Sequence, residues 1–497
     1  MNVFLLYPDR DFDTAHELPW NEQSICEDLE LDILFSAMAG EDTLIYSIVK
    51  TALLTGMEND RDTLIYRQQI IKDCIDHPLQ VKELYSLARQ AIDFERKSFF
   101  GVFRYPSAII NRSLEVMDKF VDILKRIRKL ADTYQHEFKS PGWIRFFSMI
   151  QSELSDSYFN EVDKHLNGLR FKKGTLISAN LGVGNKGENY TLRKPFESKQ
   201  TLLNSLRNLR RDKNLIVVDE RDDRGYRALS DIRDIGLNHV ANSLTKSVDH
   251  ILSFFTLLNK ELGFYIGCLN LINQIRDRNH IFSFPEPVDG SENMLSFTGL
   301  YDICLLLTST EPVVGNDLNA DSKNLLIITG ANQGGKSTFL RSLGVSLLMM
   351  QAGMFVPAAS YKGSLHSSLF THYRREEDES MKSGKLDEEL HRMSEIVERL
   401  SPGAIGLFNE SFSATNEREG SEIARQIVLS LIESGVSIVF VTHLTDFATS
   451  IYRKKLPSTL FLRADRLKDG ARTFKILPGE PQDTSFGIDL YNMVFKE

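Results

Sequence analysis

Residues 325–338 read Leu325-Leu326-Ile327-Ile328-Thr329-Gly330-Ala331-Asn332-Gln333-Gly334-Gly335-Lys336-Ser337-Thr338. The first five residues form an apolar run typical of a buried strand, and a Leu- and Met-rich helical pattern follows Thr338. Gly330–Thr338 therefore satisfies the pattern GxxxxGK[ST] between a strand and a helix. Such a loop curls so that its backbone N–H groups face phosphate oxygens. Chance matches to the bare pattern are common, but these flanks favour a nucleotide-phosphate site.

Two residues of this loop have side chains with specific expected roles. Lys336 is expected to reach the β- and γ-phosphates, and the Ser337 hydroxyl is expected to ligate Mg²⁺. The sequence thus predicts ATP and Mg²⁺ as cofactors, with Gly330, Ala331, Asn332, Gln333, Gly334, Gly335, Lys336, Ser337 and Thr338 as the binding residues.

A second apolar run, Ala404–Phe408, ends in Asn409 and Glu410. In P-loop ATPases such a strand delivers a carboxylate toward the metal and, next to it, a glutamate that orients the attacking water. Asn409 is therefore predicted as a metal ligand, although its amide brings no charge and should hold Mg²⁺ less tightly than Asp. We favour water activation for Glu410 over a helix-capping role.

A third run, Ser437–Thr442, is followed by His443. An imidazole at the carboxyl edge of a parallel sheet is placed to sense a γ-phosphate. By itself it would be an ordinary surface histidine. Beside the two other motifs, a catalytic role is the preferred interpretation.

The pattern of apolar residues along the chain changes near Pro285, Pro287 and Gly290. Before them, apolar residues recur every three to four positions, most clearly in 114–127 and 240–269, which predicts long helices. After them, short β-rich runs alternate with helical stretches, which predicts a mainly parallel sheet covered by helices. The fold class is therefore multidomain, with a mainly α-helical region at 1–284 and an α/β P-loop domain at 285–497.

A strand-like insert, at about 171–226, interrupts the helical region, with β-like runs at Thr175–Ala179 and Asn189–Leu192 and a second apolar run at Leu215–Val218. Its flank is basic: Arg193, Lys194, Lys199, Arg207, Arg210, Arg211 and Lys213 stand against Glu197 and Asp212. Two interpretations remain open for this flank, a solvated helix surface and a phosphate-contacting patch.

Composition narrows the function classes. Among 497 residues, 68 acidic and 59 basic side chains give a net charge of −9, so nucleic-acid affinity must come from a local basic face. The four cysteines are far apart and form no CxxC pair, which argues against a zinc module or a disulfide framework. We expect a reducing, cytoplasmic location without an export signal or a membrane span.

These motifs together resemble the MutS family of DNA mismatch-repair ATPases. The resemblance rests on Thr329–Thr338, on Gln351–Ala358, on Asn409-Glu410 followed by Gly420, and on Thr442-His443. Shorter similarities lie at Glu311–Val314 with Asn316-Asp317, at Ser485–Ile488, and, in the helical region, at Arg67–Gln69.

The resemblance implies an ABC-type ATPase that forms a homodimer and acts on DNA, with repair proteins as further partners. Each composite site would be completed in trans by a signature segment, most similar here to Ser383–Leu386. It also implies that residues 1–284 form core and lever helices and that the insert is a DNA-gripping clamp.

The chain departs from the family pattern in three ways. Asn409 stands where the usual aspartate is expected, and residues 411–417 differ from the usual Gly/Thr/Ser-rich stretch, which implies slow hydrolysis. No Phe-x-Glu wedge is found near the start, so mismatch reading by the standard route is not expected. Two alternatives stay open: a non-hydrolysing, ATP-gated clamp or scaffold, and a P-loop kinase or GTPase, although no Asn-Lys-x-Asp guanine motif is present.

Overall fold

The computed structural model describes residues 1–98, 105–172, 174–194, 217–219, 221–375, 384–467 and 472–481. These residues form two compact units. Unit 1 contains residues 1–3, 83–137 and 145–259, and unit 2 contains residues 4–82, 138–144 and 260–497. Unit 2 thus joins N-terminal residues of the predicted helical region to the predicted α/β region.

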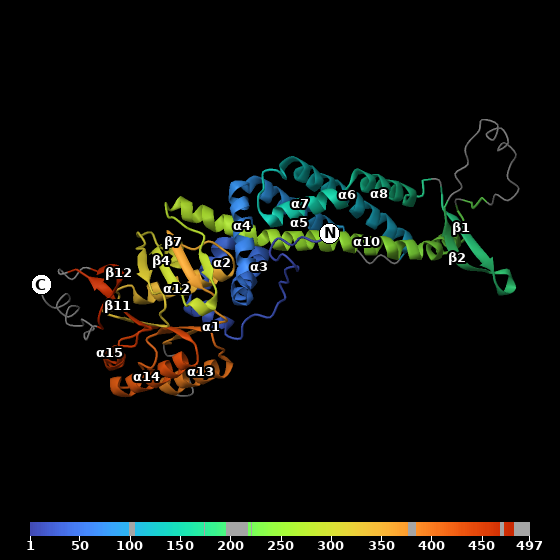
Figure 1. Ribbon diagram of the computed structural model, residues 1–497. Coiled ribbons are helices and arrows are strands. Elements are labelled where there is room, and N and C mark those ends of the chain that lie inside the picture. Colours follow the sequence, from blue (N-terminus) through green and yellow to red (C-terminus); the bar gives the residue numbers. More distant parts are fainter. Residues whose placement is uncertain are drawn as a thin grey trace. The chain divides into compact units, whose positions relative to one another are not determined.

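Unit 1 consists mainly of long helices, as the apolar periodicity predicts (Figure 1). Its helices are α5 (Pro78–Lys97), α6 (Pro106–Tyr134), α7 (Pro141–Glu153), α8 (Asp156–Leu169) and α10 (Asp223–Asp277), of which α5, α7 and α10 continue into unit 2. The apolar stripe of α6 is buried, and Phe120 packs edge-on against Phe255 of α10, with ring centroids 5.1 Å apart.

A two-stranded hairpin lies between α8 and α10, inside the predicted insert. Its strands β1 (Leu176–Leu181) and β2 (Gly187–Arg193) are antiparallel and flank the short 3₁₀ helix η2 (Val183–Asn185). Val217 and Val218, the described part of the apolar run Leu215–Val218, are not in a strand. Leu215, together with the basic residues Lys199–Lys213, lies outside the described residues.

Unit 2 is built on a six-stranded sheet with the order β12-β11-β6-β10-β9-β8. All neighbouring pairs are parallel except β11 with β12. The strands are β6 (Leu325–Thr329), β8 (Leu369–Tyr373), β9 (Ile405–Asn409), β10 (Ser437–Val441), β11 (Thr459–Arg466) and β12 (Arg472–Pro478). Every residue of β6 is buried, as expected for a parallel strand covered on both faces.

Helices cover both faces of this sheet. On one face, α13 (Lys385–Arg399), α14 (Glu417–Glu433) and α15 (Thr445–Lys454) share a core with alternate residues of the strands, among them Leu325 and Ile327 (Figure 1). On the other face, α12 (Lys336–Gln351) contacts β9 and β10. The predicted alternation of strand and helix is confirmed.

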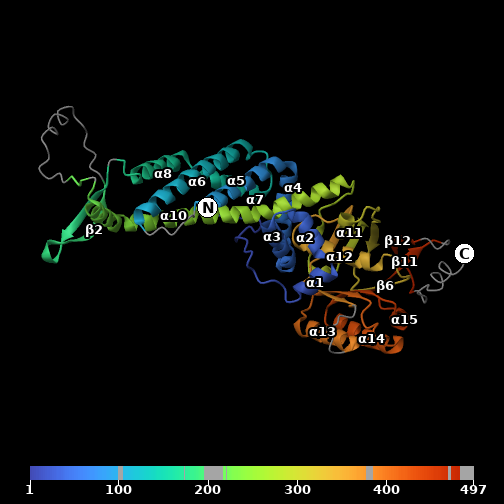
Figure 2. The ribbon, with the colours of Figure 1, turned by 180° about the vertical axis from the view of Figure 1, so that it is seen from behind.

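The remaining elements of unit 2 lie around α12. A four-stranded sheet has the order β3-β7-β4-β5, and α1 contacts β8. Helices α2 and α3 contact α11 and α12, respectively (Figure 2). The bounds are α1 (Glu22–Asp28), α2 (Leu31–Ala39), α3 (Thr43–Leu54), η1 (Gly56–Glu58), α4 (Arg61–Asp76), β3 (Glu286–Val288), η3 (Gly290–Glu292), β4 (Leu295–Leu300), α11 (Ile303–Thr308), β5 (Asn316–Asn319) and β7 (Ser360–Ser364). Within the described parts of the chain, no helix combines the length and apolar character needed to cross a bilayer.

Candidate functional site

The loop at Gly330–Gly335 connects the carboxyl end of β6 to the amino end of α12. Its φ angles are positive at Gly330 (118°), Gln333 (58°) and Gly335 (87°), a region that favours glycine. At Gly334 a Cβ atom would lie 2.8 Å from the Ala464 Cβ, so a side chain would push the loop away from β11. The glycines therefore permit a tight turn whose backbone amides lead into a helix N-terminus.

Lys336 begins α12, and only 5% of it is exposed. Its Nζ donates to the carbonyl oxygens of Gly330 and Ala331, each at 2.9 Å. Burial lowers the pKa of Lys336 to about 8, and the charge of Glu410 opposes this shift. The ammonium is thus held inside the curl of the loop, and below pH 8 it is charged there.

Ser337 and Asn409 meet although 72 positions separate them. The Ser337 hydroxyl donates to Oδ1 of Asn409 at 3.0 Å. A hydroxyl and an amide oxygen are hard donors that suit Mg²⁺, but neither is charged. Among the described residues, no cluster of three or more His, Cys, Asp or Glu side chains could hold a metal ion. This pair suits a weakly held Mg²⁺, whose remaining ligands would have to come from phosphate and water.

Glu410 and His443 follow the neighbouring strands β9 and β10. Their side chains meet, with Oε1 of Glu410 2.9 Å from Nε2 of His443, at ion-pair distance but without hydrogen-bond alignment. This contact is the largest cause that lowers the pKa of Glu410, and Lys336 lowers it further. Glu410 is therefore ionised at neutral pH. Its own φ is 56°, and its backbone N–H donates to the carbonyl of Val441 at 2.9 Å.

A cavity of about 300 Å³ lies beside the loop. Its walls include Gln333, Gly335 and Thr338 from the loop and α12, Pro312–Val314, and Phe474 of β12. The backbone N–H of Ile476 donates to Oδ1 of Asn316 at 2.7 Å, which fastens the 312–316 segment to β12. Arg472 of β12 also donates to Oε1 of Gln333 at 2.5 Å. The similarity at Glu311–Val314 marked one wall, but nothing marked Phe474 or Arg472.

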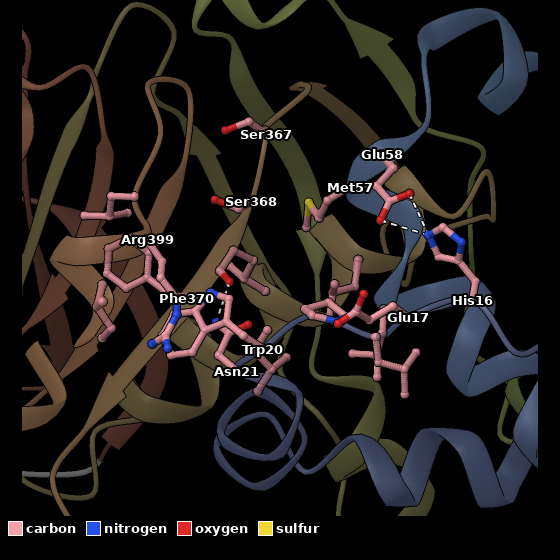
Figure 3. Close-up of a pocket in the computed structure, with 18 residues that line it drawn as sticks. His16, Glu17, Trp20, Asn21, Met57, Glu58, Ser367, Ser368, Phe370 and Arg399 are labelled. Atoms are coloured by element: carbon pink, nitrogen blue, oxygen red, sulfur yellow. Dashed lines mark hydrogen bonds and ion pairs between the residues drawn. The ribbon is translucent and has the colours of Figure 1, made fainter.

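A larger cavity, of about 480 Å³, lies elsewhere in unit 2 and contains none of the predicted site residues (Figure 3). It is lined by the amino end of β8 and by Leu348, roughly 18 Å along α12 from Lys336. The His16–Glu58 pair, with Nε2 and Oε2 2.9 Å apart, stands at one side, and Arg399 lies over the ring of Trp20 at the other (Figure 3).

Comparison with known families gives two matches along the chain. The family "MutS2 N-terminal domain" matches residues 59–278, from just before α4 to the end of α10. The family "MutS domain V" matches residues 326–496. The chain belongs to the MutS family. The second MutS match contains Gly330–Thr338, Asn409, Glu410 and His443, and therefore every described residue that the sequence predicts for the site.

Individual MutS relatives agree with this assignment. The "DNA mismatch repair protein MutS" of Fusobacterium nucleatum subsp. nucleatum is 22% identical over 90% of this chain and 48% of its own length. The proteins of the same name from Lactobacillus delbrueckii subsp. bulgaricus and Thermotoga maritima are 26% and 30% identical over 59% and 36% of this chain, and 33% and 23% of their own lengths. The chain thus spans about half, or less, of the length of these relatives.

The structure brings together most of the predicted site. Gly330–Thr338, Asn409, Glu410 and His443 lie at the carboxyl ends of β6, β9 and β10, which are neighbours in the order β6-β10-β9. Ser383 and Ser485–Ile488 lie outside the described residues.

Proposed function

We propose that this MutS-family chain binds ATP with Mg²⁺ at the Gly330–Thr338 loop and hydrolyses it. The observation that carries the proposal is the convergence of a buried lysine, a hydroxyl–amide pair and an ionised glutamate at the ends of three adjacent strands. In open α/β sheets, ligands bind outside the carboxyl ends of the strands. A P-loop kinase or GTPase is disfavoured by membership of the MutS family.

Each group has a distinct role in this proposal. The backbone amides of the loop and Lys336 bind the β- and γ-phosphates, with Lys336 exchanging its two carbonyl partners for phosphate oxygens. Ser337 and Asn409 would hold Mg²⁺, which supplies positive charge that neutralises the phosphate oxygens. The cavity beside Phe474, at about 300 Å³, would receive the nucleobase.

Glu410 is the proposed group that orients the attacking water. Its carboxylate is ionised and can accept a hydrogen bond from water, and the adjacent His443 ring would contact the γ-phosphate. Steady-state phosphate release by the wild type and by Glu410→Gln tests this assignment. We expect turnover in the wild type and a loss of about 100-fold or more in the variant, with ATP binding retained; equal turnover in the two proteins would refute the role.

A second candidate function is an ATP-gated clamp that does not turn over. The neutral Asn409 in the metal pair is the observation that favours it, because weak Mg²⁺ binding slows hydrolysis. Turnover with and without DNA separates the two candidates. Tight ATP binding without phosphate release under either condition would select the clamp.

We further propose that the protein acts on DNA as a homodimer, in mismatch repair, recombination or related DNA maintenance. Support comes from the names of its relatives and from an exposed hairpin that ends at the basic residues Arg193 and Lys194. Replacing Arg207, Arg210 and Arg211 by Gln should weaken DNA binding and flatten its salt dependence. The log–log slope should fall by about one unit for each DNA phosphate that the variant no longer neutralises.

A matched control for the DNA test changes the same charge elsewhere. Arg418, Arg453 and Lys454 are exposed in unit 2, and their replacement by Gln should leave the salt slope unchanged. An equal effect of the two triple variants would show that only net charge matters. An unchanged slope in the first variant would identify the basic flank as a solvated surface.

A further inference from the structure

The segment that follows Glu410 is buried and conformationally unusual. Ser411 and Phe412 are fully buried, and φ is 56° at Glu410 and 62° at Phe412. Residues other than glycine rarely adopt such angles and keep them only where the surroundings hold them. The surroundings of this segment therefore determine where the Glu410 carboxylate lies.

Two buried polar side chains hold this segment. Oε2 of Glu389 accepts a hydrogen bond from the backbone N–H of Phe412 at 2.8 Å. The His372 ring of β8 stacks on the Phe412 ring at 5.2 Å, and its Nδ1 lies 2.8 Å from the Ser411 hydroxyl. From the other side, Phe412 is pressed against α14, where a Cβ on Gly420 would lie 2.3 Å from the Phe412 carbonyl oxygen.

The hydrogen-bond pattern fixes the tautomer of His372. Burial lowers the pKa of this ring to about 3, so it is neutral and carries one N–H. Among the described residues, the hydrogen-bond partner of Nε2 is an acceptor, the carbonyl oxygen of Glu389 at 3.0 Å, so Nε2 must hold the proton. Nδ1 is then unprotonated and can accept a hydrogen bond from the Ser411 hydroxyl. The carbonyl oxygen of His372, 2.5 Å from Oγ of Ser411, is a second acceptor for the same hydroxyl.

The hydrogen bonds of Phe412 and of His372 both lead to the same residue of α13, Glu389. Glu389 lies in the second turn of α13, and it contributes its side chain to Phe412 and its backbone carbonyl to His372. A carboxylate on an otherwise charged helix would ordinarily face water, yet only 4% of Glu389 is exposed. Burying a carboxylate is costly unless it accepts hydrogen bonds, and Glu389 accepts one from the backbone N–H of Phe412.

We propose that Glu389 and His372 are positioning residues that hold the 410–412 segment, with Glu410 and Phe412 in the left-handed region, and make the placement of Glu410 depend on α13. A displacement of the first turns of α13 would pull on Phe412 and Ser411 together and shift the carboxylate that orients water. This inference rests on the proposed ATPase function.

The test uses the full chain and three substitutions in α13. Glu389→Met keeps the length of the side chain but removes the acceptor for Phe412. Glu389→Gln is a conservative control that keeps a carbonyl oxygen as acceptor. Glu395→Met is a matched control that makes the same Glu-to-Met substitution at an exposed position of α13. For each protein, the Kd for a fluorescent ATP analogue, kcat and KM are measured, and folding is checked by circular dichroism.

We expect Glu389→Met to lower kcat about 100-fold while the Kd changes less than about threefold, because misplacing a reacting group by about 1 Å costs that much. Glu389→Gln should recover most of kcat, and Glu395→Met should match the wild type. If Glu389→Met does not fold, His372→Phe provides the second test, because it keeps a ring between Phe408 and Phe412. It should show the same loss of kcat.

Two outcomes would overturn this inference but leave the proposed ATPase function standing. One is a folded Glu389→Met or His372→Phe with wild-type kcat. The other is a parallel loss of ATP affinity and kcat, which indicates general damage to the fold. A wild-type protein that binds but does not hydrolyse ATP would instead refute the hydrolytic function, and this inference with it. The wild-type measurement thus distinguishes the two failures.

Discussion

Burying Lys336 should destabilise the protein when no nucleotide is bound. Its pKa falls from 10.5 to about 8, a difference of about 2.5 units, and each unit corresponds to about 1.4 kcal/mol. At pH 7 the buried charge therefore costs about 3 kcal/mol. Lys336→Met removes this cost but leaves the carbonyls of Gly330 and Ala331 without their donor, at about 1 kcal/mol each. The variant should be more stable than the wild type by about 1 kcal/mol at pH 7.

The sign of this difference should reverse with pH. Between pH 8 and 10.5 the unfolded wild type binds more protons at this lysine than the folded one, so the contribution of Lys336 to the free energy of unfolding becomes less unfavourable as pH rises. Lys336→Met lacks this contribution. The stability advantage of the variant should therefore fall by about 2 to 3 kcal/mol between pH 7 and pH 10, making it the less stable protein at the higher pH.

Urea unfolding followed by tryptophan fluorescence measures this difference in the relevant unit. The two tryptophans of the chain, Trp20 and Trp143, both lie in unit 2, so the signal reports that unit. Lys454→Met, at an exposed position of α15, is the matched control and should show no such pH-dependent difference. A stability difference between Lys336→Met and the wild type that stays constant from pH 7 to pH 10 would refute the account of the buried ammonium.

Three further predictions concern the site. Asn409→Asp should reach half-maximal turnover at a lower Mg²⁺ concentration than the wild type, because it adds a charge to the Ser337–Asn409 pair; equal Mg²⁺ dependence would show that another carboxylate holds the metal. With ATP and Mg²⁺, Glu410→Gln should give the most compact dimer by light scattering, and adding Ser383→Arg should open it; a monomer under all nucleotide conditions would contradict the dimeric mechanism. Phe474→Ser should weaken ATP binding about tenfold without changing triphosphate binding, and equal losses for both ligands would remove the cavity beside the loop from the site.

Much of unit 2 could be predicted because its strands are continuous apolar runs. The run Leu325–Thr329 coincides with β6, and Ser437–Thr442 contains β10. Once parallel strands are assigned, the residues that follow them must lie at the same edge of the sheet. That rule brings Asn409, Glu410 and His443 to the loop without any knowledge of the side-chain contacts.

The missed residues are those whose role depends on contacts distant in the sequence. Phe474 and Arg472 belong to β12, which is antiparallel to β11, and their local pattern does not differ from that of an ordinary edge strand. Glu389 lies on a highly charged helix, and only the fold shows that it is buried against Phe412. Likewise, residues 4–82 join unit 2 through packing that periodicity cannot reveal.

The central claim is that the Gly330–Thr338 loop binds ATP through Lys336. Equilibrium titration of the wild type and of Lys336→Ala with a fluorescent ATP analogue tests it most directly, with circular dichroism as the check on folding. We predict saturable binding by the wild type and a loss of affinity of about 100-fold or more in a folded Lys336→Ala, because the charge-assisted bonds to phosphate disappear. Full affinity in the variant, or no binding by the wild type, would contradict the account.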